Sequence, residues 1–285
     1  MSTGFQNISD IISAQTNIQY AQNIFFYKDP RVGNAAAVAS VAGNYTSLWQ
    51  YNGSPSSGTN VVPTTAAICH RTTAGSLSQT DPISGNLYCV GIVATVAGSA
   101  AATGAGTLII YDRLCHMGGL SGTTLGNQIV SASASTRYTG SMSAGNQIYV
   151  NIYTAIGNAV RINATYINQD GITMITPSAS FGGVGLKEVD RVINLPLASG
   201  DTGVQTVNSI ILSATTVTAG NFGVFIGHPI VVVPLAIPCI ASVRDTIFGV
   251  PSLPQIFPDA CLAMLWLANS TAIPQLYGEL RLVEK

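Results

Sequence analysis

Hydrophobic and polar residues alternate along several short segments in the middle of the chain. Within residues 147–153 (QIYVNIY), Ile148, Val150 and Ile152 alternate with polar or aromatic residues. Such a period of two places successive side chains on opposite faces of a β-strand. The segment therefore predicts a strand with one apolar face.

Two short turn sequences follow this strand. Gly157-Asn158 separates it from an alternating segment at 159–167, and Asp170-Gly171 separates that segment from residues 172–176. Gly, Asn and Asp tolerate the positive φ angles that tight hairpins require. The spacing predicts three antiparallel strands connected as a meander.

Similar patterns predict ten further strands and almost no helix. These strands are expected at residues 66–70, 87–95, 106–112, 127–132, 191–195, 206–213, 222–226, 230–233, 260–267 and 275–283. More than ten short strands separated by turn residues favour an all-β fold, an antiparallel β-sandwich with jelly-roll-like connectivity.

The N-terminal region differs from this pattern. Residues 8–18 predict the one short helix, with Ser9 as its cap and four isoleucines forming a partial apolar stripe. A short apolar strand is expected at 23–27 (NIFFY), and residues 52–59 (NGSPSSGT) predict a loop.

These segments suggest two parts of the chain. We expect residues 1–60 to form an N-terminal helix and extended arm outside the main core. Residues 61–285 are expected to form the jelly-roll-like β-sandwich domain, as one sandwich or as two packed sandwiches.

Charged side chains are scarce. The chain has 11 Lys and Arg and 12 Asp and Glu among 285 residues, or 8% charged, against about 25% in an ordinary soluble domain. Hydroxyl and amide groups cost far less to bury than ions, provided that they find hydrogen-bond partners. Because the net charge is only −1, little repulsion keeps copies apart. The composition predicts a protein whose surface is covered by other protein.

The composition also argues against several other classes of protein. Basic residues form no cluster, so no nucleic-acid partner is expected. The most apolar stretch, 230–237, is interrupted by Pro234 and is far shorter than the ~20 residues of a membrane span. The first 27 residues contain no Lys or Arg, which predicts the absence of a secretory leader.

Two Cys-His dipeptides, Cys69-His70 and Cys115-His116, are the candidates for metal binding or for a cysteine nucleophile. Neighbouring residues of a strand point to opposite faces, and no CxxC or HxxxH spacing supplies further ligands. No adjacent cation or helix terminus predicts an activated thiol. We favour buried, reduced thiols and expect no metal ion, no cofactor and no enzymatic activity.

The densest charge cluster is KEVDR at residues 187–191. Glu188 and Asp190 would share one face of a strand, so a glycosidase-type carboxylate pair is one interpretation. Lys187 and Arg191 offer counter-ions, however, and such pairs normally come from different strands. An exposed salt-bridged edge or intersubunit contact is favoured.

Aromatic residues supply the other interface candidates, because Tyr and Trp combine a large apolar face with a polar tip. Trp266, within an apolar segment, is assigned to the core, whereas Trp49 near a loop is assigned to an interface. The predicted interface residues are Phe25, Phe26, Tyr27, Tyr45, Trp49, Tyr51, Lys187, Glu188, Asp190 and Arg191.

Four stretches carry a resemblance to a known group of proteins: YDRLCHMGGLSG (111–122), ATYINQDG (164–171), ASGDTGVQTVNSIILSATTVTAGNFGV (198–224) and DACLAMLWLA (259–268). With the N-terminal helix and NIFFYKD, the chain resembles virion structural proteins of tailed bacteriophages that are encoded near the capsid genes. These motifs are turn and strand signatures. The resemblance implies a β-rich, capsid-bound protein of the decoration or cement type, without an active site.

The sequence and the resemblance together predict a structural protein of the virion. It would bind the outside of the head and stabilise the assembled shell, with the major capsid protein and further copies of itself as partners. A trimer is expected ahead of a dimer, on the capsid surface and in the host cytoplasm during assembly. The alternative is a receptor- or glycan-binding head or tail spike; an enzyme is the weaker alternative.

Overall fold

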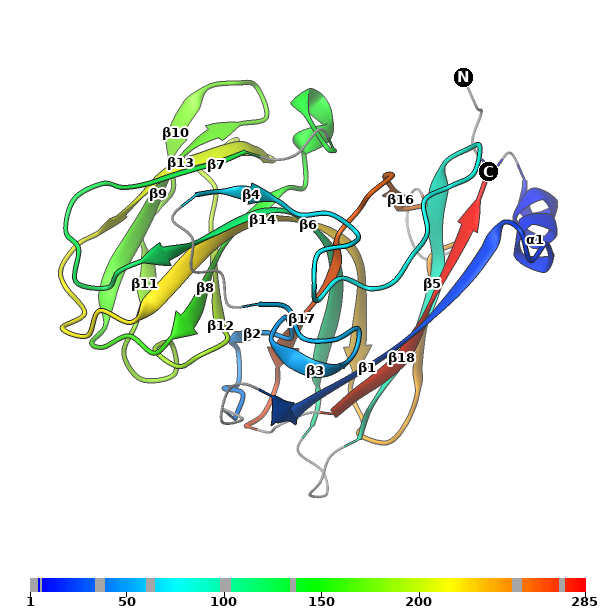
Figure 1. Ribbon diagram of the computed structural model, residues 1–285, viewed down its shortest axis with the longest axis horizontal. Helices are drawn as coiled ribbons and strands as arrows, with labels where there is room; N and C mark the ends of the chain where they lie inside the picture. The colour runs from blue at the N-terminus through cyan, green and yellow to red at the C-terminus, as the bar shows by residue number, and fades with distance from the viewer. Residues whose placement is uncertain are drawn as a thin grey trace.

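The computed structural model of the chain consists almost entirely of antiparallel strands (Figure 1). It describes residues 5, 7–33, 39–59, 65–97, 104–133, 137–247, 253–271 and 275–285. The elements are α1 (Ile8–Thr16), β1 (Ala21–Gly33), β2 (Tyr45–Ser47), β3 (Tyr51–Ser54), β4 (Ala67–Ile68), β5 (Leu87–Ala97), β6 (Gly106–Leu120), β7 (Gln128–Ser133), the 3₁₀ helix η1 (Gly140–Ser143), β8 (Gln147–Thr154), β9 (Val160–Asn168), β10 (Thr173–Ile175), β11 (Ala179–Phe181), β12 (Arg191–Leu195), β13 (Val204–Leu212), β14 (Asn221–Leu235), β15 (Ser242–Asp245), β16 (Gln255–Ile256), β17 (Leu262–Ala268) and β18 (Gln275–Glu284). The predicted all-β fold with a short N-terminal helix is confirmed.

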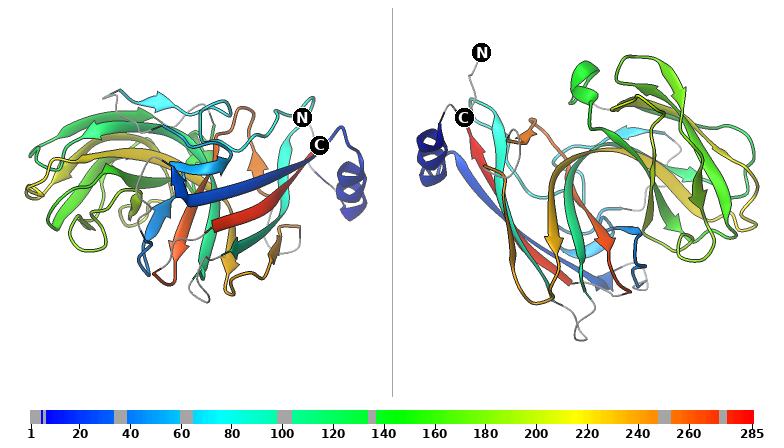
Figure 2. Two further views of the ribbon diagram at one scale, coloured as in Figure 1. Left: turned by 60° about the horizontal axis from the view of Figure 1, so that its bottom comes forward. Right: turned by 180° about the vertical axis from the view of Figure 1, so that it is seen from behind.

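The strands form three sheets. Sheet A has the order β15-β5-β18-β1-β3, with β16 also paired to β5. Sheet B has the order β14-β8-β12-β2-β17-β6-β4, and sheet C the order β10-β9-β13-β7, with β11 paired to β9. Sheets A and C lie on opposite sides of sheet B (Figures 1 and 2).

Sheet B closes on itself. Its first strand, β14, also pairs with β6 along their length, from Phe222 opposite Leu120 to Leu235 opposite Gly106. Strands β14, β8, β12, β2, β17 and β6 therefore form a closed ring, in which β14 and β6 each have a partner on both sides. We call this ring the barrel. Closure leaves these strands without a free edge.

Both faces of the barrel wall are buried. The aromatic rings of Tyr111, Tyr149 and Phe225 come from three different strands of the ring and pack against one another at 4.9–6.2 Å, so they fill its interior. Ile148 and Val150, which alternate with Tyr149, belong instead to the large apolar cluster shared with sheets A and C. The expectation of one apolar face on β8 is thus incomplete, because its aromatic and polar face is covered as well.

The predicted meander is confirmed at one turn and wrong at the other. Strands β9 and β10 pair across Asp170-Gly171, with Thr173 opposite Ile167. Strand β8 belongs to the barrel and β9 to sheet C, so Gly157-Asn158 connects two sheets. At this crossing the backbone of residue 158 donates a hydrogen bond to Thr216 O at 2.7 Å. A Cβ on Gly157 would collide with the same carbonyl group, which explains the glycine.

The N-terminal region also differs from the expected arm. Strand β1 pairs with β18 on one side and β3 on the other, and β2 lies in the barrel between β12 and β17. Ile24 and Phe26 on β1 are buried in the main core, 7% and 3% exposed. Sheet A and the barrel both contain strands from before and after residue 60. Burial of Ile24 and Phe26, which alternate with exposed residues of NIFFY, explains why this segment is a strand of the main body.

Helix α1 is the one N-terminal element that lies on the outside of a sheet. Asn7, and not the expected Ser9, caps it: Asn7 Oδ1 accepts a hydrogen bond from the backbone N–H of Asp10 at 3.0 Å. Only Ile11 of the predicted stripe is buried, against Val90 and Val283 of sheet A. No helix among the described residues is long and apolar enough to cross a membrane.

Candidate functional site

Sheet A presents one face to the barrel and one face outward. Alternation along β1 shows this most clearly, because Phe26 is 3% exposed and its neighbour Phe25 is 70% exposed. The residues opposite Phe25 on the next strands are Glu279 and Val93. The outward face of the three central strands consists of Asn23, Phe25 and Tyr27 on β1, Tyr277, Glu279 and Arg281 on β18, and Gly91, Val93 and Thr95 on β5. We call this surface, with the adjoining residues of β15, the outer face.

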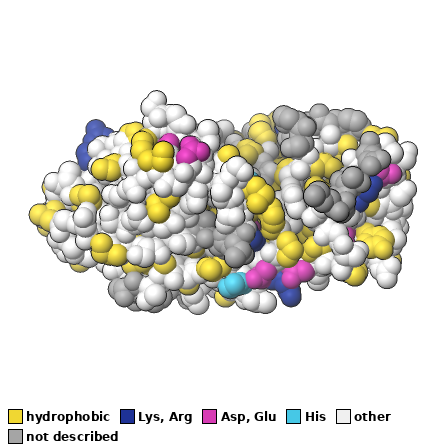
Figure 3. Space-filling model, turned by 90° about the horizontal axis from the view of Figure 1, so that it is seen from above, with side chains coloured by type: hydrophobic (Ala, Val, Ile, Leu, Met, Phe, Trp, Pro, Cys, Tyr) yellow, Lys and Arg dark blue, Asp and Glu magenta, His cyan; other side chains and the backbone are white. Residues whose placement is uncertain are grey.

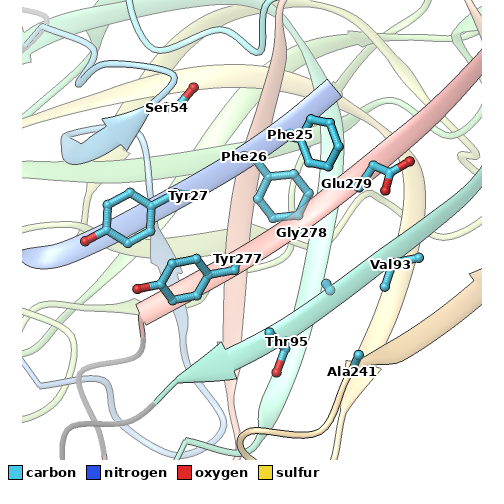
Figure 4. Close-up of a pocket in the computed structure, with 11 residues that line it drawn as sticks. Phe25, Phe26, Tyr27, Ser54, Val93, Thr95, Ala241, Tyr277, Gly278 and Glu279 are labelled. Carbon is cyan, nitrogen blue, oxygen red and sulfur yellow. The ribbon is translucent and has the colours of Figure 1, made fainter. Parts of the chain in front are cut away.

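An aromatic hollow lies at one end of the outer face. It has a volume of about 460 Å³, and Figure 4 shows Phe25, Tyr27 and Tyr277 around it. The two tyrosine rings stack with centroids 4.7 Å apart. Beneath them β18 carries Gly278, whose missing side chain leaves room for the Phe26 ring. Large apolar side chains thus lie at a surface that none of the described residues covers.

Polar side chains at the rim of the aromatic hollow form hydrogen bonds on β1 and on β18. The Tyr27 hydroxyl donates to Asp29 Oδ2 at 2.8 Å, and Gln275 Nε2 donates to the same oxygen at 2.6 Å. The hydrogen bond to Asp29 raises the pKa of Tyr27, because it stabilises the protonated phenol. On β18, Arg281 Nε donates to Glu279 Oε1 at 3.0 Å.

The depression continues along the outer face towards α1. Two further hollows of about 230 and 220 Å³ adjoin it, and both are lined by Arg281 and by Gln15 of the helix. Glu279 lines both the aromatic hollow and the first of these, and Val93 lines both the aromatic hollow and the second. We call the whole depression the sheet A groove. It is apolar at the Tyr277 end and polar at the α1 end.

A second aromatic cluster lies in the barrel interior around Arg113, which is fully buried. Its guanidinium donates to the hydroxyls of Tyr111 and Tyr153 at 3.2 and 3.0 Å and to His116 Nδ1 at 3.1 Å. It also lies 4.6 Å from the centre of the Trp49 ring. Burial and the nearby Arg113 charge lower the pKa of His116 to about 3, so the ring stays neutral and accepts this hydrogen bond.

The other aromatic interface candidates lie mostly inside the molecule. Trp49 is 1% exposed in the barrel interior, Tyr51 is 6% exposed and Phe26 is 3% exposed, so their burial within one chain explains them. Tyr45 is half-buried. Phe25, with Tyr27 beside it, remains available at the surface, and an interface role for these two stays a prediction.

The KEVDR cluster does not form a charged edge. Asp190 and Arg191 are 2% and 1% exposed, whereas Lys187 is exposed and Glu188 half-buried. Because β12 begins only at Arg191, Glu188 and Asp190 lie in a turn and share no strand face. The Arg191 guanidinium donates to Thr46 Oγ1 at 2.9 Å, inside the chain.

Asp190 has an unusual environment for a carboxylic acid. It adopts a φ of 64°. Its backbone bonds to Ile152 O and to the N–H of Ser47, both at 2.8 Å, which ties the turn to the barrel. One carboxyl oxygen has no hydrogen-bond partner among the described residues. Burial raises the pKa of Asp190 to about 7, so a proton remains on it well above the usual range.

The structure does not combine the two Cys-His dipeptides into one site. Cys69 and Cys115 are buried, and burial raises the pKa of Cys115 to about 12, which disfavours the reactive thiolate. His70 Nδ1 contacts Asp259 Oδ2 at the surface, whereas His116 belongs to the barrel interior. Among the described residues, no group of three or more His, Cys, Asp or Glu side chains could hold a metal ion.

Sequence reasoning missed the partners of Phe25 and Tyr27 on the neighbouring strands. Tyr277, Glu279 and Arg281 alternate with Leu276, Leu280 and Leu282 along β18, so the period-two signal was present. What the sequence could not show is that β18 lies between β1 and β5. This pairing joins the first and last strands of the chain and depends on contacts across more than 200 residues.

No protein-family model matches the chain, and no curated protein matches it. Among solved structures, the chain is similar to VP2 of infectious bursal disease virus in a subviral particle. The identity is 8% and the TM-score 0.19, over 98% of this chain and 86% of that one. It is also similar to T=1 particles derived from the same virus, with 8% identity and a TM-score of 0.20 over 93% and 77% of the two chains. TM-scores of this size do not establish a shared fold.

Proposed function

We propose that this chain is a structural protein of a virion, which binds and stabilises the capsid of a tailed bacteriophage as a decoration or cement protein. The observation that carries the proposal is an uncovered aromatic groove in a chain with only 8% charged residues. Large exposed apolar patches rimmed by polar residues mark interaction sites, among them surfaces where proteins meet. Figure 3 supports this, since charged side chains are few among uncharged ones on the face it shows.

The mechanism would be passive. Contacts made only with the assembled shell add their binding free energy to that state, and the shell becomes harder to disrupt by mass-action linkage. The low content of ions favours this, because hydroxyl and amide surfaces cost less to desolvate than charged ones. The partners would be the major capsid protein and further copies of this chain.

The alternative, a receptor- or glycan-binding spike, would present exposed aromatic and carboxamide side chains on a distal group of loops. Here the exposed Phe25 and Tyr277, with the half-buried Tyr27, lie on paired strands in the middle of a sheet. A broad sheet surface suits contact with a second protein surface, which favours the capsid role.

Cryo-electron microscopy of particles that carry the protein tests this function. We expect it on the head lattice at a regular copy number, and we expect capsids without it to break at lower temperature or under osmotic shock. Density at the tail tip alone would overturn the capsid role. Capsids of unchanged robustness would remove the stabilising part of it.

A further inference from the structure

The central strand of sheet A carries a charge pattern that is complementary to itself. Strand β18 has β5 and β15 on one side and β1 and β3 on the other. Along its outward side the order is Tyr277, Glu279 and Arg281, so an acid and a base are neighbours on one face. If two copies met through this face about a two-fold axis between these residues, Glu279 of each copy would face Arg281 of the other. Isologous interfaces require this kind of self-complementarity.

The same axis places a protruding ring over a gap. On β1, Phe25 lies beside Glu279 and Asn23 lies beside Arg281. The two-fold axis of two sheets stacked face to face lies in the plane between them and runs across β18, so it exchanges the ends of each strand and Phe25 of one copy meets Asn23 of the other. Phe25 is 70% exposed, and Asn23 lines a hollow of about 230 Å³. A phenyl ring would therefore enter a space that is already present.

Helix α1 fits the same arrangement. It packs on the sheet beyond Arg281, at the end where the C-terminus lies (Figures 1 and 2). Ile8 and Ile12 are 45% and 54% exposed and share one side of the helix with Gln15, which lines the groove. The two-fold axis exchanges the ends of the groove. It therefore brings this isoleucine side of each helix to the aromatic hollow of the other copy.

The area of the outer face is sufficient for a stable pair. Ten residues on each of the three central strands and four on each of β3 and β15, at about 4.8 Å spacing and about 3.3 Å per residue, cover roughly 600 Å² per copy, to which the exposed side of α1 adds. Standard protein interfaces bury about 800 Å² per partner. At the centre of this face the charged residues are Glu279 and Arg281, and the two-fold pairing gives each an opposite charge.

We propose that the outer face of sheet A binds the same face of a second copy of this chain, about a two-fold axis between Glu279 and Arg281. The inference rests on the proposed function only in treating the chain as a component that assembles with itself. The occupant of the groove is thus the α1 end of the second copy, and the pair is an isologous dimer.

The mass of the purified full-length chain in solution tests the pairing first. Light scattering after size exclusion, over a concentration series, should give a dimer for the wild type and a monomer for Phe25→Asp. Ile129→Asp is the matched control, because Ile129 is 65% exposed on the edge strand β7 of sheet C. This control should remain a dimer, and circular dichroism should show all three proteins folded. A monomeric wild type, or a trimer, would overturn the proposal.

Charge exchange tests the position of the axis. Glu279→Arg and Arg281→Glu each place like charges opposite one another twice, and each should weaken the dimer about 10-fold or more. The double variant restores both pairs and should return the dissociation constant to within about 3-fold of the wild type. Single variants without effect, or a double variant as weak as the singles combined, would contradict this axis. Head-lattice binding is measured separately, so a failure there leaves the dimer result intact, and the reverse also holds.

Discussion

The barrel interior and the outer face of sheet A contain similar side chains, which are buried in the barrel and exposed on the outer face. Each contains an arginine among tyrosine and phenylalanine rings. Arg113 is fully buried, donates to two phenols and a neutral imidazole, and lies over the rings of Trp49 and Phe225. Arg281 is about half exposed and pairs with Glu279, which leaves the pair free to exchange partners. Aromatic content therefore does not identify an interface. What identifies it is whether other parts of the same chain cover the face of the strand that carries the aromatic residues.

The largest expected difference between the two regions is in how much each arginine contributes to the free energy of unfolding. Arg113→Ala leaves the hydroxyls of Tyr111 and Tyr153 without this donor in a sealed interior, and we expect it to cost about 4 kcal/mol of unfolding free energy. Arg281→Ala should change it by less than about 0.5 kcal/mol. Urea denaturation at concentrations where the chain is monomeric measures both. Equal losses of unfolding free energy would show that Arg113 stabilises the fold no more than Arg281 does.

Adjacent phenylalanines on β1 provide the next contrast. Phe26→Ala removes a ring from the main core and should destabilise the fold by about 3 kcal/mol, whereas Phe25→Ala should cost less than about 0.5 kcal/mol in the monomer. The same denaturation experiment applies. A large loss for Phe25→Ala would mean that the outer face is covered within one chain.

Asp190 provides a pH-dependent effect in the barrel wall. Its folded pKa of about 7 exceeds the ordinary value of about 3.9, so its contribution to stability is full at low pH and is lost as the pH rises through 7. Asn tolerates the same positive φ and does not ionise. We expect the stability of Asp190→Asn, relative to wild type, to increase by about 2.5 kcal/mol between pH 5 and pH 8. A constant difference across this range would contradict a buried, protonated Asp190.

The smallest effect concerns the rim of the groove. Tyr27→Phe removes the hydrogen bond to Asp29 and should cost about 1 kcal/mol in the monomer. Tyr277→Phe is the control, because the structure records no hydrogen bond of its hydroxyl among the described residues, and it should be nearly neutral. Thermal unfolding of the two variants side by side measures the difference. Equal shifts would argue that Asp29 does not orient the Tyr27 ring.

Local patterns predicted the strands of this molecule far better than their partners. The turn at Asp170-Gly171 could be read because both of its strands are neighbours in sequence. Strand β8 could be predicted, but the closure of the barrel that buries its second face depends on β14 pairing with β6. The same limit explains the expected arm, because β1 finds its partner β18 at the far end of the chain.

The candidate site shows the same division. The sequence pointed to Phe25 and Tyr27, and it also pointed to Trp49, which the barrel encloses. An aromatic residue near a loop looks alike in sequence whether a ring of strands covers it or not. Glu279 and Arg281 were passed over because their importance arises only from their place on the central strand of sheet A.

The central claim is that protein covers the outer face of sheet A, and hydroxyl-radical footprinting over a concentration series tests it most directly. Oxidation of Phe25 and Tyr277 should fall as the chain self-associates. Oxidation of Met142, which is 52% exposed in η1 away from this face, should stay constant. Oxidation of Phe25 and Tyr277 that does not change between dilute and concentrated protein would contradict the claim.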